Sequence, residues 1–204
     1  MTPRCRWSRP PLDPALQPGD AAVWRFQADA IRPIEIVLAK YLGLEPSSVR
    51  LRRSRGGKAE LQGSAFRVNL AHSGEVALVA VGRGRDIGVD VEVLREGTEK
   101  WSLVRHALTA DERARLQALP VSQRSGAFLQ VWTRKEALLK AVGVGLSVDP
   151  QLIELDGASV VSVPPALGEP SDWTLADVPV PGYAAALAVY GRLTRVLLFD
   201  ARAS

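Results

Sequence analysis

The sequence predicts an α+β fold, in which small antiparallel sheets pack against helices. Two segments with helical signals, 33–42 and 102–142, are each followed by a series of short β-type runs. Helices grouped ahead of strands, without strict alternation of the two, are typical of antiparallel α+β proteins. Because this order occurs twice along the chain, it also indicates an internal duplication.

The composition is that of a globular chain with an excess of positive charge. Hydrophobic residues make up 47% of the 204 positions and charged residues 24%, which is ordinary for a globular protein. No apolar run reaches the length of a membrane span, and no apolar stretch follows the N-terminal arginines, so we expect a cytoplasmic protein without a membrane partner. The net charge of +4 favours an anionic partner. Because the chain lacks an aromatic-studded basic strand or a paired recognition helix, we expect no nucleic acid.

The first half is predicted to contain an arm, one helix and several strands. Residues 1–21 are rich in proline and indicate a loose arm before a β-type run at 22–26. Pro33 at the first helical position and Gly43 just beyond the last predict a helix over 33–42. Two more strands are expected at 49–53 and 65–70. The segment 76–94 holds two β-branched runs around the turn sequence GRGR, which predicts a β-hairpin.

The second half is predicted to begin with helices and end with strands. A helix is expected over about 102–118, and Thr109 and Glu112 stand at capping-box spacing, where the helix can break and restart. Pro120 ends it, and a second helix from about 123 to 142 stops at the glycines of AVGVGL. Beyond Ser147 the sequence alternates short strands with proline turns. The β-type runs are LIELD, VVSV, WTLADV, AAALAVYG and RVLLF.

Two carboxylates share one face of the strand that contains DIGVDVEVL. Asp90 and Glu92 are two residues apart, so both side chains leave the same side of the strand and the intervening valines leave the other. Neighbouring carboxylates repel each other, and a divalent cation removes that cost. Because the chain has a single cysteine, Cys5, and two histidines, any metal must be held by oxygen atoms. An isolated D-x-E is also the ordinary solvated face of a strand, so this motif alone leaves both interpretations open.

A second group of candidate residues lies along the predicted helix that ends at Val142. Trp132, Glu136 and Lys140 are spaced by four, so they stack on one helical face, with Lys135 next to them. On an exposed helix, Glu136 and Lys140 would be an ion pair worth about 0.3–0.5 kcal/mol. The combination of an acid, an ammonium and a large aromatic ahead of a glycine-rich turn favours a ligand site, because glycine lets a backbone approach a ligand closely.

Together these segments resemble the signature motifs of Sfp-type 4′-phosphopantetheinyl transferases. GVDVE fits the pattern G-[IV]-D-[IV]-E, and WTRKEALLKAVGVG fits W-[ST]-x-K-E-A-x-x-K-x-x-G-x-G. Upstream, NLAHSGEVALVAV is similar to the family's N-[IL]-S-H-S-G segment, and the resemblance covers about 41–146. It implies two similar α+β halves related by a pseudo-twofold axis. The N-terminal half would span 1–88 and include the arm 1–21, and the C-terminal half would span 89–204. The active site would lie between them.

The resemblance also implies a reaction and a set of site residues. The phosphopantetheine arm of coenzyme A would move to a serine of an apo acyl or peptidyl carrier protein, an acidic helical partner, and 3′,5′-ADP would leave. Magnesium would be held by Asp90, Glu92 and Glu136, and manganese would substitute for it. The catalytic residues would be Asp90, Glu136 and Lys140. Glu136 would act as the general base, and Lys140 would offset the charge on the leaving phosphate. The residues expected to contact coenzyme A are Arg53, Arg55, Lys58, His72, Ser73, Lys135 and Lys140.

Two departures from the family pattern change these expectations. Ala71 stands where the family usually has a serine, and an arginine-rich segment before Tyr41 that contacts the 3′-phosphate of coenzyme A is missing. Arg25 and Arg32 are candidates to replace it. A solvated basic loop at 53–58 and a structural His72 are the plainer alternatives. We expect a monomeric enzyme, and the alternative is a non-catalytic relative that binds coenzyme A or a carrier protein.

Overall fold

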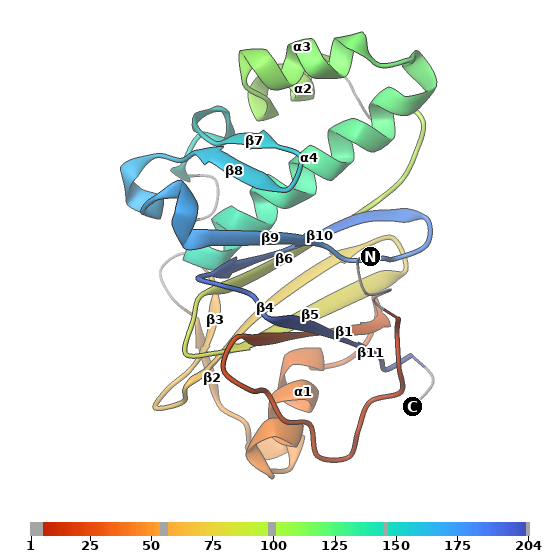
Figure 1. Cartoon of the computed structure of the whole chain (residues 1–204). Coiled ribbons are helices and arrows are strands. Elements are labelled where there is room, and N and C mark those ends of the chain that lie inside the picture. The colour runs from red at the N-terminus through yellow and green to blue at the C-terminus, as the bar shows by residue number, and fades with distance from the viewer. Residues whose placement is uncertain (1–5, 54–56, 98–100, 145–146, 203–204) are drawn as a thin grey trace.

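The computed structural model of the chain stacks two β-sheets face to face, with helices on both outer faces. It describes residues 6–53, 57–97, 101–144 and 147–202. Helix α1 (Pro33–Leu42) covers the outer face of one sheet and α4 (Val121–Val142) that of the other, so the layers run helix, sheet, sheet, helix (Figure 1). The α+β class predicted from the sequence is confirmed.

The first sheet has the strand order β11-β1-β5-β4. Its strands are β1 (Asp20–Gln27), β4 (Phe66–Ser73), β5 (Val76–Arg83) and β11 (Arg195–Asp200). Side chains alternate across it: Val23 and Leu78 face the core between the sheets, whereas Trp24 and Val79 face α1. Strand β11 pairs in parallel with β1, so the last strand of the chain completes the sheet formed by the first half.

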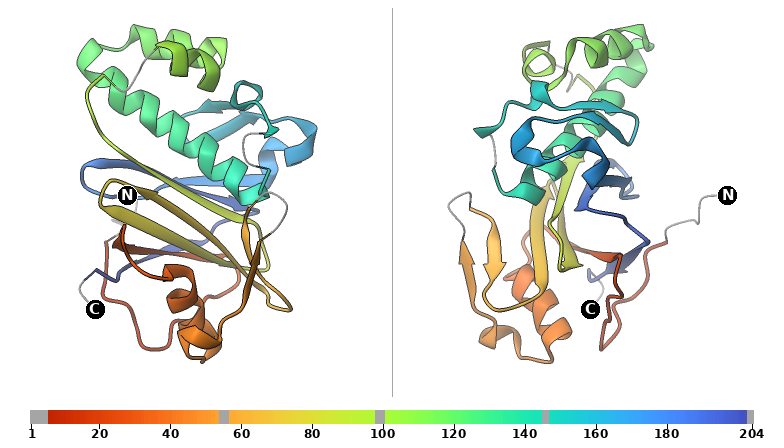
Figure 2. Two further views of the ribbon diagram at one scale, coloured as in Figure 1. Left: turned by 180° about the vertical axis from the view of Figure 1, so that it is seen from behind. Right: turned by 60° about the vertical axis from the view of Figure 1, so that its left-hand side comes forward.

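The second sheet has the order β6-β10-β9 and lies under α4. Its strands are β6 (Ile87–Val93), β9 (Trp173–Asp177) and β10 (Tyr183–Tyr190). The shorter helices α2 (Trp101–Ala107) and α3 (Ala110–Ala118) lie at the far end of α4 (Figure 2). Two small hairpins complete the fold, β2 (Leu51–Arg53) with β3 (Ala59–Leu61), and β7 (Glu154–Asp156) with β8 (Ser159–Ser162).

The two halves repeat one topology. In chain order the three sheet strands of the first half are β1, β4 and β5, and the third of them, β5, lies between the other two in the sheet. In the second half the third strand, β10, likewise lies between β6 and β9. Each half also inserts helix and a small hairpin between its first two sheet strands. The duplication indicated by the sequence therefore appears in the strand order. Strand β11 is the exception, because it lies in the first sheet although it falls within the predicted C-terminal half.

Several predicted elements are confirmed by the hydrogen bonds that end them. Helix α1 spans the predicted residues and closes on Gly43, which has φ of 63°. The capping box is present, since the Thr109 hydroxyl accepts from the Glu112 amide at 3.2 Å and the Glu112 carboxylate accepts from the Thr109 amide at 2.8 Å. These bonds end one helix and start the next, as the spacing predicted.

The predicted hairpin over 76–94 is wrong. Strand β5 pairs with β1 on one side and β4 on the other, whereas β6 pairs with β10 in the second sheet. Both edges of β5 are occupied, so no edge is left for β6. The GRGR turn carries the chain from one sheet into the other.

None of the described helices is both long and apolar enough to cross a bilayer.

Candidate functional site

The carboxylates of β6 face α4, and a glycine sets how closely they approach it. A Cβ at Gly88 would lie 1.9 Å from the Ala137 carbonyl and 2.5 Å from the Ala141 amide, so only glycine lets the helix rest on the strand here. Lys140, one turn from Ala137, donates to Asp90 Oδ1 at 2.6 Å. The sequence motif at 88–92 and the described part of the second motif, 132–144, thus meet in space.

The three acids of the two motifs lie close enough to influence one another. Burial raises the pKa of Asp90 from its usual 3.8 to about 6; Lys140 opposes this shift, and the charges of Glu136 and Glu92 add to it. Burial also raises the pKa of Glu136; the charge of Lys140 opposes this shift, and the charge of Glu92 adds to it. Such shifts mean that the protein surroundings disfavour the negative charge, and a bound cation would reverse that preference.

Asp90 and Glu136 each have a carboxylate oxygen without a partner. Asp90 Oδ2 and Glu136 Oε1 are buried and receive no hydrogen bond, a costly arrangement for charged groups. Two anionic oxygens that lack donors suit a hard cation such as Mg²⁺. However, among the described residues no three His, Cys, Asp or Glu side chains form a ready-made metal group. The residues therefore fit a shared site in which substrate oxygens and water complete the shell.

Ser73 lies beside the acids, in contact with Glu92. Its hydroxyl donates to Glu92 Oε2 at 2.9 Å and accepts from the Val93 amide at 3.2 Å. We predicted Ser73 as a contact to coenzyme A, and in this structure it contacts the carboxylate instead. Glu92 is half-buried at the end of β6 and remains next to Asp90.

Lys135, which we predicted as a phosphate contact, lies inside the fold in this structure. Its side chain is fully buried (0% exposed), and its ammonium donates to Glu112 at 2.5 Å, to the Ala107 carbonyl at 2.8 Å and to the Pro150 carbonyl at 3.0 Å. Neighbouring residues on a helix point about 100° apart, so Lys135 leaves the face that carries Glu136. Burial lowers the pKa of Lys135, and Glu112 opposes that shift.

The basic segment 53–58 is divided between structure and surface. Lys58 is buried against the end of α4, where its ammonium donates to the Ala141 carbonyl and to Asp86 Oδ1, the latter at 3.3 Å. This is the expected place for a cation at a helix C-terminus, so Lys58, which we predicted to contact coenzyme A, is held by the fold in this structure. Arg53 is exposed and donates to the Gly57 carbonyl at 2.9 Å. Arg55 lies outside the described residues.

None of the described hydrogen bonds or ion pairs joins the acids to His72 or to the two candidate arginines. His72 is exposed on β4 and, by alternation, leaves the opposite face from Ser73. Arg25 is buried in an ion pair with Asp200 and its guanidinium stacks 4.4 Å from the centre of the Trp7 ring. Arg32 pairs with Glu35 at 3.0 Å. Arg25 is therefore committed to the fold, which rules it out as a replacement for the missing basic segment in this conformation.

Three residues that position the site were not identified as such from the sequence. Asn69 accepts from the Val89 amide at 2.9 Å, Glu112 neutralises Lys135, and Gly88 permits the contact with α4. Each had a signal in the sequence: Asn69 and Gly88 begin recognisable motifs, and Glu112 belongs to the capping box. Their spatial partners, however, are 20 or more residues away along the chain.

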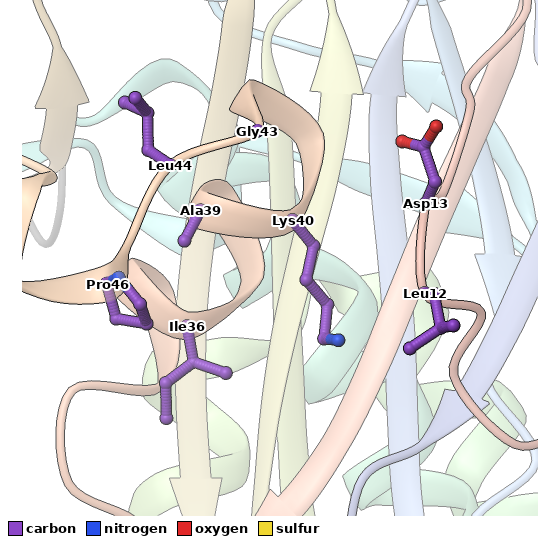
Figure 3. Close-up of a pocket in the computed structure, with 8 residues that line it drawn as sticks. All are labelled: Leu12, Asp13, Ile36, Ala39, Lys40, Gly43, Leu44 and Pro46. Atoms are coloured by element: carbon purple, nitrogen blue, oxygen red, sulfur yellow. The ribbon is translucent and has the colours of Figure 1, made fainter.

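Two hollows of the surface involve α4 and the arm, and neither is lined by the three acids. Trp132, one helical turn before Glu136, lines a hollow of about 400 Å³; its other lining residues are Leu103, His106, Ser147, Asp149, Pro150 and Gln151. A hollow of about 590 Å³ lies between the arm and α1, where Leu12 and Asp13 stand beside Ile36 and Lys40 (Figure 3). That second hollow contains no predicted site residue.

Comparison with known proteins points to one family. The model of the 4′-phosphopantetheinyl transferase superfamily matches residues 86–188, which include both motifs. The 4′-phosphopantetheinyl transferase HetI of Nostoc sp. is 36% identical over 160 residues, covering 76% of this chain and 66% of HetI. A putative 4′-phosphopantetheinyl transferase of Synechocystis sp. is 30% identical over 151 residues, covering 72% and 61%. The chain thus spans slightly less than two thirds of the length of these relatives.

Among solved structures, a holo-(acyl-carrier-protein) synthase from Bacillus anthracis in complex with CoA (3′,5′-ADP) aligns with a TM-score of 0.44 and 22% identity. The alignment covers 52% of this chain and 96% of that one.

Proposed function

Because this chain belongs to the 4′-phosphopantetheinyl transferase superfamily, we propose that it transfers the phosphopantetheine arm of coenzyme A to a serine of an apo carrier protein. The observation that carries the proposal is the meeting of Asp90, Glu136 and Lys140 between β6 and α4, with two buried carboxylate oxygens lacking donors. A carboxylate pair beside an ammonium suits a site that must bind a diphosphate and remove a proton.

The reaction forms one bond and breaks one. The carrier serine oxygen attacks the β-phosphorus of coenzyme A, the bond from that phosphorus to the bridging oxygen breaks, and 3′,5′-ADP leaves with the electron pair. Glu136 takes the serine proton, directly or through a water molecule, because its carboxylate is buried, lacks a donor at Oε1 and has a raised pKa that makes it a better base. Lys140 offsets the charge that develops on the leaving phosphate.

Asp90 and Glu136 would hold Mg²⁺ or Mn²⁺, with Glu92 beside them, and the ion would neutralise the diphosphate. When the ion binds, Asp90 would replace part of its contact with Lys140 by a contact with the ion. The ammonium of Lys140 could then contact the substrate. Arg53 and His72 are exposed and remain candidates for phosphate contacts. The carrier protein would be an acidic partner of this basic chain, and we expect a cytoplasmic monomer that does not bind nucleic acid.

The test is a mass measurement on an apo carrier protein incubated with this protein, coenzyme A and Mg²⁺. We expect the carrier to gain the mass of one phosphopantetheine arm, and to gain nothing when a chelator is present. A chain that binds coenzyme A yet leaves the carrier unmodified with several carrier proteins would instead be a non-catalytic relative. The intact acids and Lys140 argue against that alternative, since binding alone does not need them.

A further inference from the structure

Strands β4 and β6 run beside each other at the junction of the two sheets without pairing through their backbones. Each lies at an edge of its own sheet, and two side chains of β4 span the gap. Asn69 Oδ1 accepts from the Val89 amide at 2.9 Å and Ser73 Oγ accepts from the Val93 amide at 3.2 Å. Both bonds join residues 20 apart, so the two strands run parallel and in constant register.

Ala71 stands midway between these two side chains and faces the same core. The alternation of the strand directs the Val91 amide to the same side as the amides of Val89 and Val93. The methyl group of Ala71 cannot accept a hydrogen bond from the Val91 amide. Side chains of β4 therefore hold β6 at two points, one before Asp90 and one after Glu92.

Ser73 differs from Asn69 because it makes a second contact. While its oxygen accepts from Val93, its hydroxyl proton is donated to Glu92 Oε2 at 2.9 Å. One hydroxyl thus connects the backbone of β6 to the carboxylate that the same strand carries. Among the described residues no hydrogen bond is found to the other oxygen of this carboxylate, Oε1.

From this arrangement we infer that Ser73 is a positioning residue for the metal site: it fixes the carboxylate of Glu92 so that Oε1 is presented beside Asp90 and Glu136. The inference rests on the proposed function, because it gives Glu92 the role of a metal ligand. A half-buried glutamate with three rotatable bonds loses conformational freedom when it binds an ion, and a hydrogen bond formed beforehand reduces that loss.

Variants at the two β4 positions separate positioning from support of the fold. Ser73→Ala removes both contacts, Ser73→Thr keeps the hydroxyl, and Asn69→Ala removes a strand-holding bond of the same kind without touching a carboxylate. Mn²⁺ binding, followed by electron paramagnetic resonance with coenzyme A present, reports the site without any turnover, and thermal unfolding reports the fold.

We expect Ser73→Ala to weaken Mn²⁺ binding about tenfold, as loss of a hydrogen bond to a ligand typically does. Ser73→Thr should stay within about twofold of the wild type, because the hydroxyl that donates to Glu92 is retained. Asn69→Ala should lower the melting temperature and leave Mn²⁺ affinity unchanged. Excess Mg²⁺ should restore transfer by Ser73→Ala and fail to restore any loss caused by Asn69→Ala.

Unchanged Mn²⁺ affinity in Ser73→Ala would overturn the inference, as would an equal loss in Asn69→Ala. If Ser73→Ala does not fold, Ser73→Cys, which keeps the volume but donates weakly, should show an intermediate affinity; an affinity equal to that of the wild type would overturn the inference. A wild-type protein that binds Mn²⁺ but never modifies a carrier would count against the proposed function and leave the positioning of Glu92 standing.

Discussion

The first strands of the two halves occupy equivalent places and present opposite chemistry to their helices. Towards α1, β1 shows Ala22, Trp24 and Phe26, which are buried and apolar. Towards α4, β6 shows Gly88, Asp90 and Glu92. One position of the repeated topology thus supports a hydrophobic core in the first half and a polar site in the second.

The edges of these two strands differ in the same way. Strand β1 has backbone partners on both sides, β11 and β5, whereas β6 has β10 on one side and only the side chains of β4 on the other. The helices differ too, since α1 has 10 residues and α4 has 22. The second half thus carries the polar residues of the candidate site, and the first half contacts them from β4.

The largest expected effect is the loss of turnover when the acid on α4 is neutralised. Glu136→Gln should lower the rate of carrier modification by on the order of 10²–10⁴-fold, the contribution of a positioned base. Because burial raises the pKa of Glu136, the neutral glutamine should not lower the melting temperature of the metal-free protein. Transfer near the wild-type rate would show that α4 does not supply the base and would break the comparison.

The next effect concerns the buried pair that joins α3 to α4, which has no counterpart beside α1 among the described residues. Lys135→Met leaves Glu112 buried and unpaired, so it should cost about 3–5 kcal/mol of the free energy of unfolding. The double variant Lys135→Met with Glu112→Gln should recover part of that loss, because no lone charge remains. Denaturant unfolding measures both. If Lys135→Met instead kept its stability and lost affinity for coenzyme A, Lys135 would be a ligand contact after all.

A pair of glycine substitutions tests the close contact of strand and helix in the second half. Gly88→Ala places a methyl group against Ala137 and should cost about 1–3 kcal/mol or more by overpacking. Transfer should fall as well, because the separation of β6 from α4 moves Lys140 away from Asp90.

Gly126→Ala is the matched control, since Gly126 lies in α4 with nothing within 4 Å of its added Cβ. It should raise stability by up to about 1 kcal/mol through helix propensity. Equal stability changes at the two glycines, measured by denaturant unfolding, would mean that the strand and helix are not in tight contact.

The smallest effect concerns the short helical region of the first half. Arg25 is held by Asp200 and Arg32 by Glu35, so both candidate contacts to the 3′-phosphate of coenzyme A already have acidic partners. Removing that phosphate, as in dephospho-coenzyme A, should therefore cost less than about 1.5–3 kcal/mol, the usual value of a charge-assisted contact. The measurement is kcat/KM for both cofactors with one carrier protein. A preference well above a hundredfold would reveal a basic group that this conformation does not bring to the site.

Local signals in the sequence predicted the parts of the fold that depend on local interactions. Pro33 and Gly43 bounded α1 correctly because both act through their own backbone geometry. Thr109 and Glu112 broke the helix where their spacing predicted, since the capping box closes within four residues. The meeting of β6 with α4 followed from the motifs, although their contact through Gly88 did not.

Interactions between distant residues could not be predicted from the sequence. The GRGR turn favoured a hairpin, and the pairing of β5 with β1 and β4 left no free edge for it. Because Lys135 is next to Glu136 in the sequence, we assigned both to one site. In the structure the ammonium of Lys135 is bound by Glu112, 23 residues away. Ser73 was expected at the cofactor from the family motif, and nothing in the sequence reveals that Glu92 Oε2 lies 2.9 Å from its hydroxyl.

The parallel pairing of β11 with β1 has a consequence for the order in which the chain folds during synthesis. Asp20 pairs with Arg195, and their side chains form an ion pair at 2.6 Å across 175 residues. On the ribosome, the outer edge of β1 therefore stays open until residues 195–200 have been made. Such an exposed strand edge invites pairing with other nascent chains, so translation that stalls before residue 195 should yield aggregates in place of a folded first half.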